Sequence, residues 1–390
     1  MAEQAYLDHA ASAPLEPGAA EAMADVAALA GNPSSVHAFG RRLREEIDRA
    51  RASVAALFGV APASVTFTSG ATEANALALL GAWRAAAKAH PGRRLRVVAS
   101  PIEHASVRGT LALLEEEGAE VVLLPVDADG AVSADDAAAA ITPDTALVSV
   151  MWANNVIGSL QPVEAIGRAV AAERARRAKN GLPILLHSDA VQAVRALPVD
   201  PAAAGVDLLA VSAHKIGGPK GAGALIRPGR AALEPLMRGG GQEEGLRSGT
   251  ENAAAIAGFG RAAEMLASGR REGAERMVAL RDAFLAALRR GAPDAEVVGD
   301  AAKRVPHIVF IRLPGMRGDL LAMALDAAGF AVSAGSACDG GARRPSHVLS
   351  AVLDGSRAAH GGIRVSFGPS TPGTDLARLA GAISAARGRQ

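Results

Sequence analysis

The sequence predicts an α/β protein with a large, mostly parallel sheet domain and a smaller α+β domain. Between about residues 60 and 230, short β-branched or aliphatic runs alternate with longer stretches rich in Ala, Leu, Arg and Glu, which is the pattern of βαβ units. After about residue 290 the elements become shorter and less regular. We therefore expect a large domain over residues 16–255, and a small domain formed by residues 1–15 and 256–390.

The individual elements follow from hydrophobic periodicity. Strands of the large sheet are predicted at residues 65–68, 95–99, 120–124, 146–152, 183–187, 207–212 and 222–226. Helices are predicted at residues 35–58, 72–88, 106–117, 163–179 and 252–290, the first and last being the most clearly amphipathic. The shorter elements of the small domain are expected at residues 305–313, 318–329, 331–341, 343–353 and 361–368, before a terminal helix.

Composition excludes several classes of protein. The 390 residues carry 41 basic and 40 acidic side chains, so bulk charge favours neither nucleic acid nor an acidic membrane as a partner. Hydrophobic residues make up 49% of the chain, too many for a disordered protein. The single cysteine, Cys338, excludes an intramolecular disulfide and any zinc site that needs paired cysteines. The sequence shows no secretory signal or transmembrane run, so we expect a cytoplasmic protein without a metal.

A candidate phosphate site follows the first strand of the predicted sheet. Residues 65–80, VTFTSGATEANALALL, place Ser69, Gly70, Ala71 and Thr72 between a strand and a helix. Free N–H groups at a helix start, a glycine and a hydroxyl suit an anion. An ordinary capped surface helix is the alternative. The segment matches neither a Walker A loop nor a GxGxxG fingerprint, so nucleotides are disfavoured.

A lysine and an aspartate lie at the ends of two further strands. Lys215 is one of only five lysines, and it follows a hydrophobic strand in DLLAVSAHKIGGPKGAGAL. Asp189 ends the strand in PILLHSDAVQAV, with Gln192 three residues later. Taken alone, Lys215 could instead be a solvated surface lysine, and Asp189 could instead cap a helix. Together with the phosphate cradle they are the three anchors of a pyridoxal phosphate site, where the lysine forms an imine and the carboxylate holds the pyridine nitrogen.

Ten ordered motifs resemble those of the cysteine desulfurases, in the class V aminotransferase superfamily of fold-type I pyridoxal phosphate enzymes. The resemblance extends nearly end to end and is to the branch that supplies sulfur for iron–sulfur clusters and thiolated tRNA. The motifs are YLDHAASAPL, GNPSSVH, FTSGATEANALAL, IEHASV, MWANNVIGSLQPV, HSDAVQAV, SAHKIGGPKGAGAL, GGGQEEGLRSGTEN, SAGSAC and GGIRVSFG.

The resemblance implies roles for the residues of these motifs. Lys215 would bind the cofactor covalently, Asp189 would pair with the pyridine nitrogen, and His104 would stack over the ring and act in proton transfer. Asn155 and Gln192 would lie near the phenolic oxygen of the ring. The remaining assignments are the phosphate ligands Ala71, Thr72, Ser212 and His214, the residue Thr250 reaching the phosphate of a neighbouring subunit, and the substrate-carboxylate residues Arg364 and Asn32.

Cys338 distinguishes a desulfurase from other members of this superfamily. The segment SAGSACDGGARR is small and polar, a poor place to bury a thiol, and Arg343 and Arg344 would favour the thiolate. The thiolate would attack the sulfur of cysteine, so that Cys338 becomes a persulfide and alanine leaves. Two departures from the family pattern are Val156, where a carboxylate is usual after the two asparagines, and Asp339, where a small hydroxyl residue is common.

The expected partners are L-cysteine, a second copy of the chain, and a sulfur acceptor such as an iron–sulfur scaffold or a tRNA thiolation enzyme. One competing hypothesis is a pyridoxal phosphate lyase or aminotransferase of the same fold that does not use Cys338. The other is a scaffold without catalytic activity that retains the fold to bind a cluster-assembly partner. Release of sulfide from cysteine in the presence of a reductant would distinguish a desulfurase from the first alternative. A yellow purified protein would count against the second.

Overall fold

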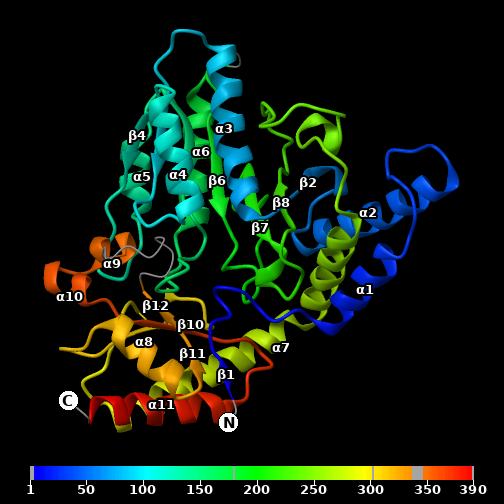
Figure 1. Cartoon of the computed structure of the whole chain (residues 1–390). Helices are drawn as coiled ribbons and strands as arrows, with labels where there is room; N and C mark the ends of the chain where they lie inside the picture. Colours follow the sequence, from blue (N-terminus) through cyan, green and yellow to red (C-terminus); the bar gives the residue numbers. More distant parts are fainter. Residues whose placement is uncertain (1–3, 179–180, 301–302, 336–345, 389–390) are drawn as a thin grey trace.

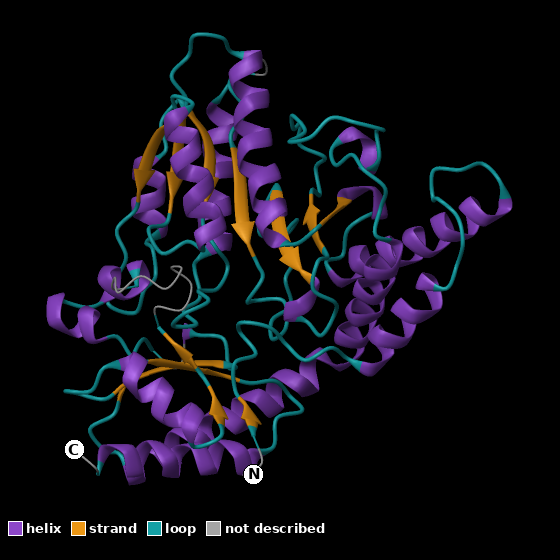
Figure 2. Ribbon diagram, in the orientation of Figure 1, coloured by secondary structure: helices purple, strands orange, loops and turns teal. Residues whose placement is uncertain are grey.

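The structure is a computed structural model that describes residues 4–178, 181–300, 303–335 and 346–388. A large sheet flanked by helices and a smaller unit beneath it make up the described chain (Figures 1 and 2). The large sheet has seven strands in the order β2-β8-β7-β6-β5-β3-β4. Their bounds are β2 Val65–Thr68, β3 Arg96–Ala99, β4 Glu120–Leu123, β5 Thr145–Ser149, β6 Leu185–Asp189, β7 Leu208–Ser212 and β8 Gly223–Ile226.

The prediction of a mostly parallel sheet is confirmed. Strands β4, β3, β5, β6 and β7 run parallel, and only β8 pairs antiparallel with β7 and β2. Each predicted strand lies within a few residues of an observed one. The expected strand 146–152 ends at Ser149, beyond which the backbone N–H groups of Val150 and Trp152 still donate to carbonyls of the neighbouring segment 187–189.

Both faces of the large sheet are buried, which explains its continuous apolar strands. Neighbouring residues of one strand point to opposite faces. Val97, Leu147 and Leu208 accordingly belong to one core cluster with helices α3 and α4, while their successors Val98, Val148 and Leu209 belong to another with α2, α6 and α7. The helices of this unit are α1 Pro17–Ala27, α2 Ala38–Leu57, α3 Ala71–Ala89, α4 Ala105–Glu116, α5 Ala134–Ala140 and α6 Val163–Arg176.

Helix boundaries follow from their caps. Helix α2 begins after His37, whose ring accepts the backbone N–H of Gly40, three residues later than the predicted start. Helix α1 was not predicted, although Pro17 at its first position is a recognised start signal.

The smaller unit is built around a four-stranded antiparallel sheet in the order β12-β13-β10-β9. Two further strands, β1 and β11, pair parallel beside it. Its elements are β1 Ala5–Tyr6, β9 Glu296–Val297, β10 Ile308–Arg312, α8 Gly318–Ala327, β11 Phe330–Ala331, β12 Ser333–Ala334, α9 His347–Val352, α10 Gly355–His360, β13 Ile363–Ser366 and α11 Gly373–Arg387.

One long helix, α7 (Ala253–Gly291), joins the two units (Figure 1). Its N-terminal half, around Phe259, packs in the core of the large sheet, and its C-terminal half, around Phe284, packs in the core of the small one. Residues Ala5 and Leu7 share that second core. The domain boundary at residues 255 and 256 therefore falls inside the first turn of a continuous helix and stays a prediction. Among the described residues, no helix is long and apolar enough to cross a membrane.

Candidate active site

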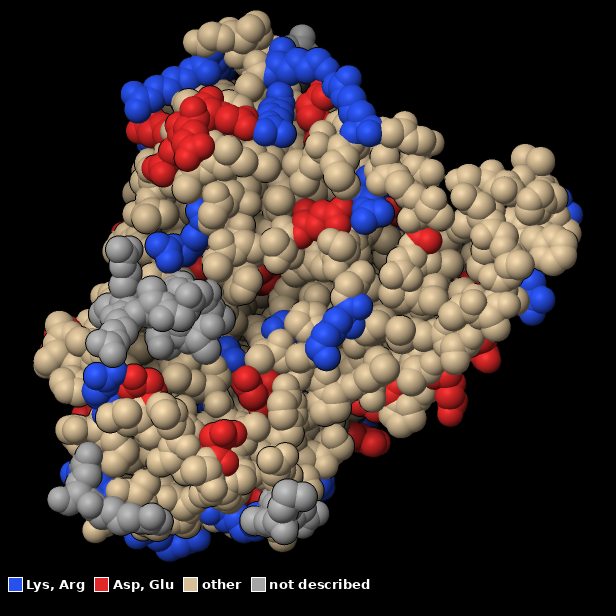
Figure 3. Space-filling view, in the orientation of Figure 1, with Lys and Arg blue, Asp and Glu red and all other residues tan. Residues whose placement is uncertain are grey.

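A cavity of about 580 Å³ lies where the ends of strands β6 and β7 meet the small unit. This edge of an open α/β sheet is the usual place for a ligand. The space-filling view shows the molecule hollowed here, with basic side chains beside the hollow (Figure 3). Ten of the residues predicted to function line it together: Ala71, Thr72, His104, Asn155, Asp189, Gln192, Ser212, His214, Lys215 and Arg364.

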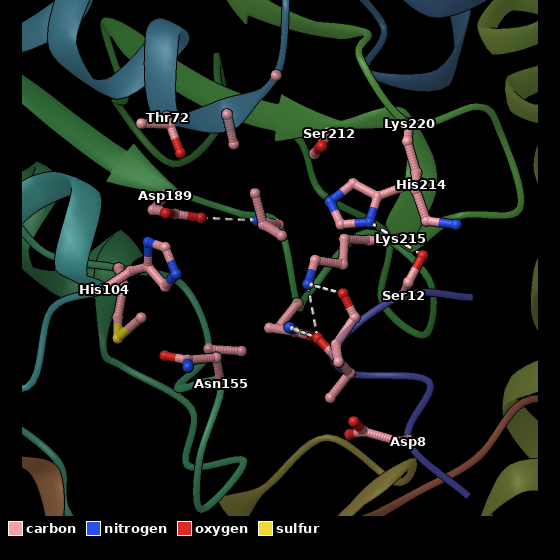
Figure 4. Close-up of a pocket in the computed structure, with 18 of the residues that line it drawn as sticks. Asp8, Ser12, Thr72, His104, Asn155, Asp189, Ser212, His214, Lys215 and Lys220 are labelled. Atoms are coloured by element: carbon pink, nitrogen blue, oxygen red, sulfur yellow. Dashed lines mark hydrogen bonds between the residues drawn. The ribbon is translucent and has the colours of Figure 1, made fainter. Parts of the chain in front are cut away.

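The start of α3 forms one wall of the cavity. The turn from β2 carries Gly70 at the N-cap, and no side chain caps the helix, so backbone N–H groups of its first turn are available to an anion. Thr72 and Ser212 add hydroxyls on the same wall (Figure 4). Close packing of this turn on β8 requires a glycine at position 223, because a Cβ there would lie 2.6 Å from the Cα of Gly70. A phosphate is the anion that this wall suits.

Lys215 reaches the cavity from the short 3-10 turn that follows β7 (Ala213–Lys215). Its Nζ donates to the carbonyl oxygens of Ala10 and Ala11 at 2.6 and 2.7 Å. Gln192 Nε2 donates to the Ala10 carbonyl as well, at 2.9 Å (Figure 4). The N-terminal segment thus holds the Lys215 ammonium group in the cavity, facing the end of β6 (Figure 4).

Neighbouring groups keep His214 neutral. Burial, and then the charges of Lys215 and Lys220, lower its pKa from 6.5 to about 4. Its Nδ1 lies 3.2 Å from the hydroxyl of Ser12. His214 therefore offers a neutral hydrogen-bonding group beside two lysines.

Asp189 is held by a buried hydrogen-bond chain. Its Oδ2 accepts from Asn75 Nδ2 at 2.8 Å, and its Oδ1 accepts the backbone N–H of Val191 at 3.0 Å. Asn75 Oδ1 in turn lies 3.0 Å from His187 Nε2, and His187 Nδ1 lies 2.9 Å from Ser149 Oγ. Burial lowers the pKa of His187 to about 3, so the ring is neutral.

The tautomer of His187 follows from these contacts. Asn75 Oδ1 can only accept, so His187 Nε2 carries the proton and Nδ1 accepts from the serine hydroxyl. This series of hydrogen bonds therefore orients the Asn75 amide so that its Nδ2 donates to the carboxylate of Asp189. These hydrogen bonds fix the orientation of the Asp189 carboxylate at the cavity.

His104 caps helix α4 from the opposite wall. Its Nδ1 accepts the backbone N–H of Ser106 at 3.2 Å and lies 2.8 Å from the Ser106 hydroxyl. Because Nδ1 accepts, the proton of the neutral ring is on Nε2. The ring lines the cavity between Asp189 and Asn155 (Figure 4).

Glu103, which precedes His104 in the chain, is buried and links the start of α4 to the segment that follows β5. Its Oε1 accepts the backbone N–H of Met151 at 2.7 Å. Burial, and further the charge of Asp189, raise the pKa of Glu103 well above its usual value. Asn154 fastens the same turn, since its Oδ1 accepts the N–H groups of Val156 and Ile157.

Arg364 enters from strand β13 of the small unit. Its Nη1 donates to the carbonyl of Asn155 and its Nη2 to Asp8 Oδ1, both at 2.8 Å. The guanidinium is nearly buried, with 5% of the side chain exposed. A planar cation at this position suits a carboxylate ligand.

Two predicted site residues lie elsewhere. Asn32 and Thr250 are exposed and do not line this cavity. Cys338 lies outside the described residues. Lys88 and Lys303, two of the other four lysines, are exposed, each beside an acidic side chain.

Several residues of the site were missed from sequence. The cavity is also lined by Asp8, Ser12, Lys220 and Ser333, and Asn75 supports it from behind. The sequence does indicate that Asn75 is near the site, because it follows Ala71 by four residues and so lies on the same face of the helix. The departure at Val156 has a local reason, since its side chain is buried in an apolar cluster with Ile102 and Phe310, where a carboxylate would be costly.

Comparison with known proteins decides the family. The model of the family described as aminotransferase class-V matches residues 5–379. The chain belongs to the class-V aminotransferase family. Class-V aminotransferases depend on pyridoxal 5'-phosphate, and this member presents the groups that such a cofactor needs.

Similar proteins cover the chain almost completely. It is 41% identical to an "IscS-like cysteine desulfurase" of Mycobacterium tuberculosis, over 98% of this chain and 97% of that one. It is 42% identical to a "Cysteine desulfurase" of Cereibacter sphaeroides, over 97% and 94% of the two chains. Among solved structures, a "NIFS-LIKE PROTEIN" superposes with a TM-score of 0.90 at 31% identity, over 99% of this chain and 100% of that one.

The cavity fits the cofactor of the family. The uncapped start of α3 with Thr72 and Ser212 would hold its phosphate, Asp189 its pyridine nitrogen, and Lys215 its aldehyde carbon. Among the described residues, no group of three or more His, Cys, Asp or Glu side chains is placed to bind a metal ion.

Proposed function

We propose that this class-V aminotransferase family member is a cysteine desulfurase, which converts L-cysteine to L-alanine and passes the sulfur on as a persulfide of Cys338. The observation that carries the proposal is one cavity that presents Lys215, Asp189, His104 and Arg364. Identity of about 40% to cysteine desulfurases over nearly the whole chain supports it. A similar solved structure, titled "SspA in complex with cysteine", has a TM-score of 0.81 at 30% identity, over 94% of this chain and 100% of that one.

The cofactor supplies an electron sink next to the α-carbon, and the chain supplies binding and proton transfer. Arg364 binds the substrate carboxylate, which fixes the α-carbon relative to Lys215 and His104. Lys215 donates to two carbonyls in the resting site, so it must release these contacts and a proton to act as a nucleophile or base. His104 lies at the opposite wall, where its ring, once it has taken a proton during the reaction, can donate that proton to the carbon that loses sulfur.

Sulfur transfer is assigned to Cys338. Its thiolate attacks the sulfur of the substrate, the carbon–sulfur bond breaks, and the electron pair stays with the substrate carbon. That carbon takes a proton from His104 or Lys215, and the product is alanine. The negative charge of Asp339 opposes formation of the thiolate, while Arg343 and Arg344 favour it. We expect activity to rise from neutral to mildly alkaline pH as the thiolate fraction grows.

The experiment is mass spectrometry of the holoenzyme after incubation with L-cysteine. We expect an added sulfur atom on the peptide that contains Cys338. The variant Cys338→Ala should still bind pyridoxal phosphate and cysteine but should transfer no sulfur. Normal alanine and sulfide production by this variant would instead support a lyase that does not use the thiol.

We also propose a homodimer with shared active sites. Thr250 is exposed on one chain, in the segment that follows the loop 239–249. Two ion pairs hold that loop on the large unit, Arg51 with Glu243 at 2.6 Å and Arg247 with Glu73 at 3.0 Å. Such fixed loops present their exposed residues to a partner at little cost in conformational entropy. A monomer by light scattering that still binds cofactor and turns over would contradict the proposal.

The remaining proposals are cytoplasmic location and an acceptor protein for the sulfur, such as an iron–sulfur scaffold or a tRNA thiolation enzyme. Both follow from the resemblance to the desulfurase branch. Labelled persulfide sulfur, chased with candidate acceptors, would identify the acceptor. Recovery of the protein in the soluble cytoplasmic fraction of its cells would test the location.

A further inference from the structure

Asp8 lies in the cavity against the arginine that is assigned to the substrate carboxylate. Its Oδ1 accepts from Arg364 Nη2 at 2.8 Å, and both residues line the cavity. Asp8 precedes the segment whose carbonyls hold Lys215, and Figure 4 shows its carboxylate at the side of the cavity opposite Thr72. The carboxylate is the more exposed member of the pair, at 21% against 5% for the arginine.

The hydrogen bonds of Arg364 use one N–H of each terminal nitrogen. Nη1 donates to the Asn155 carbonyl and Nη2 to Asp8. Nε is buried and has no hydrogen-bond partner among the described residues. An incoming carboxylate therefore meets a guanidinium that a carboxylate of the chain itself already engages at the cavity.

Asp8 is held at that position by little else. Among the described parts of the chain, its carboxylate accepts no hydrogen bond besides that from Arg364. Tyr6 Oη, at 3.1 Å, and the N–H of Ala11 both donate to its backbone carbonyl. The backbone of Asp8 is thus fixed, while its side chain can turn away once the arginine has another partner.

We propose that Asp8 occupies, in the substrate-free protein, the position on Arg364 that the substrate carboxylate takes, and that binding exchanges one carboxylate for the other. This inference rests on the proposed function, because it takes Arg364 as the carboxylate site. A buried guanidinium without a counter-charge is costly, and the exchange leaves Arg364 paired in both states.

The exchange makes Asp8 a competitor of the substrate carboxylate. A ligand with an α-carboxylate can replace Asp8, whereas an amine without one leaves the pair of Asp8 and Arg364 in place. The same competition lowers the affinity for every amino acid that the site binds. Removal of the charge of Asp8 should therefore strengthen the binding of amino acids.

The test is calorimetric binding of L-alanine and of ethylamine to the holoenzyme and its Asp8→Asn variant. Alanine carries the carboxylate and no sulfur to transfer, and ethylamine lacks the carboxylate. A neutral amide keeps the shape of Asp8 but bonds to the guanidinium less strongly by about 1.4 kcal/mol, so alanine should bind about tenfold more tightly. Ethylamine binding should be unchanged.

A matched control is Asp144→Asn, which changes a pair of the same type at the same 2.8 Å, with Arg93 on the surface. It should alter neither affinity. Asp8→Ser provides a second substitution that also removes the charge, and thermal unfolding of each variant checks that it is folded. Both Asp8 variants should show the same selective gain for alanine.

Weaker or unchanged alanine binding in the folded Asp8 variants would overturn the exchange, and weaker binding would make Asp8 a residue that only positions Arg364. The variant Arg364→Lys separates this failure from that of the proposed function. If it leaves alanine affinity unchanged, Arg364 is not the carboxylate site and the premise fails. If it weakens alanine binding while Asp8→Asn does not strengthen it, only the inference about Asp8 fails.

Discussion

Replacing Asn75 with alanine tests the buried chain that holds Asp189. Asn75 is fully buried. Its amide donates to Asp189 and to Ser106 Oγ, and its oxygen contacts His187. Asn75→Ala removes all three contacts at once and leaves a buried ring N–H and a carboxylate oxygen without their partner.

The expected loss can be estimated from these contacts. A hydrogen bond to a charged group contributes about 2 kcal/mol and a neutral one about 1 kcal/mol. The free energy of unfolding of the apoprotein should therefore fall by about 4 kcal/mol. Asp189 also loses the hydrogen bond that fixes its carboxylate, so the affinity for pyridoxal phosphate should fall about tenfold or more.

Urea unfolding of the apoprotein and titration with pyridoxal phosphate measure the two effects. The matched control is Asn252→Ala, because Asn252 is exposed and only caps α7 by accepting the N–H of Ala255. It should cost about 1 kcal/mol and leave cofactor affinity unchanged. If Asn75→Ala costs no more than this control, or binds the cofactor normally, the chain from His187 to Asp189 does not support the site.

Three further outcomes are expected. Burial lowers the pKa of His187 and of His307 to about 3, so between pH 6.5 and about 3 the unfolded chain binds protons that the folded chain does not. Acidification over this range should lower the free energy of unfolding by about 1.4 kcal/mol per pH unit for each ring. If His307→Asn leaves the slope of unfolding free energy against pH unchanged, this expectation is wrong. Glu243→Ala should lower the free energy of unfolding in urea by about 3 to 5 kcal/mol, because it leaves the largely buried Arg51 unpaired. Glu244→Ala breaks an exposed pair and should lower it by less than about 1 kcal/mol. Equal losses in the two variants would refute the distinction. Lys215→Ala should give no cofactor adduct by mass spectrometry after borohydride reduction, and an adduct retained elsewhere would remove Lys215 from its role.

The anchors of the site were predictable because each is written into a short segment. Lys215 and Asp189 both follow runs of apolar residues, and a run of that kind with a polar end predicts a strand that delivers a side chain to the edge of a sheet. The start of α3 was predictable for the same reason, as a strand followed by small residues and a hydroxyl. In each case the information lies within about ten residues.

The residues that hold the site residues in place could not be predicted from local sequence. Asn75 and Asp189 are 114 positions apart, and Asp8 and Arg364 are 356 apart. Nothing in the local sequence of Asp8 distinguishes it from a surface carboxylate near the N-terminus. The contact depends on β1 pairing with β11 and on residue 8 bridging to Ser366 at the end of β13.

The sequence by itself determined the strands of the large sheet, helices α2, α3, α4, α6 and α7, the three predicted anchors of the cofactor site and the family resemblance, because hydrophobic periodicity and motif spacing act over one element at a time. Tertiary structure decided which side chains oppose one another. It placed Arg364 of the small unit and Lys215 of the large one at the same cavity, gave the arginine Asp8 as a partner, and fixed the tautomer of His187 through Asn75. Those outcomes depend on the order of strands and on burial, which set the cost of leaving a charge or donor unpaired, and neither is encoded in any single segment.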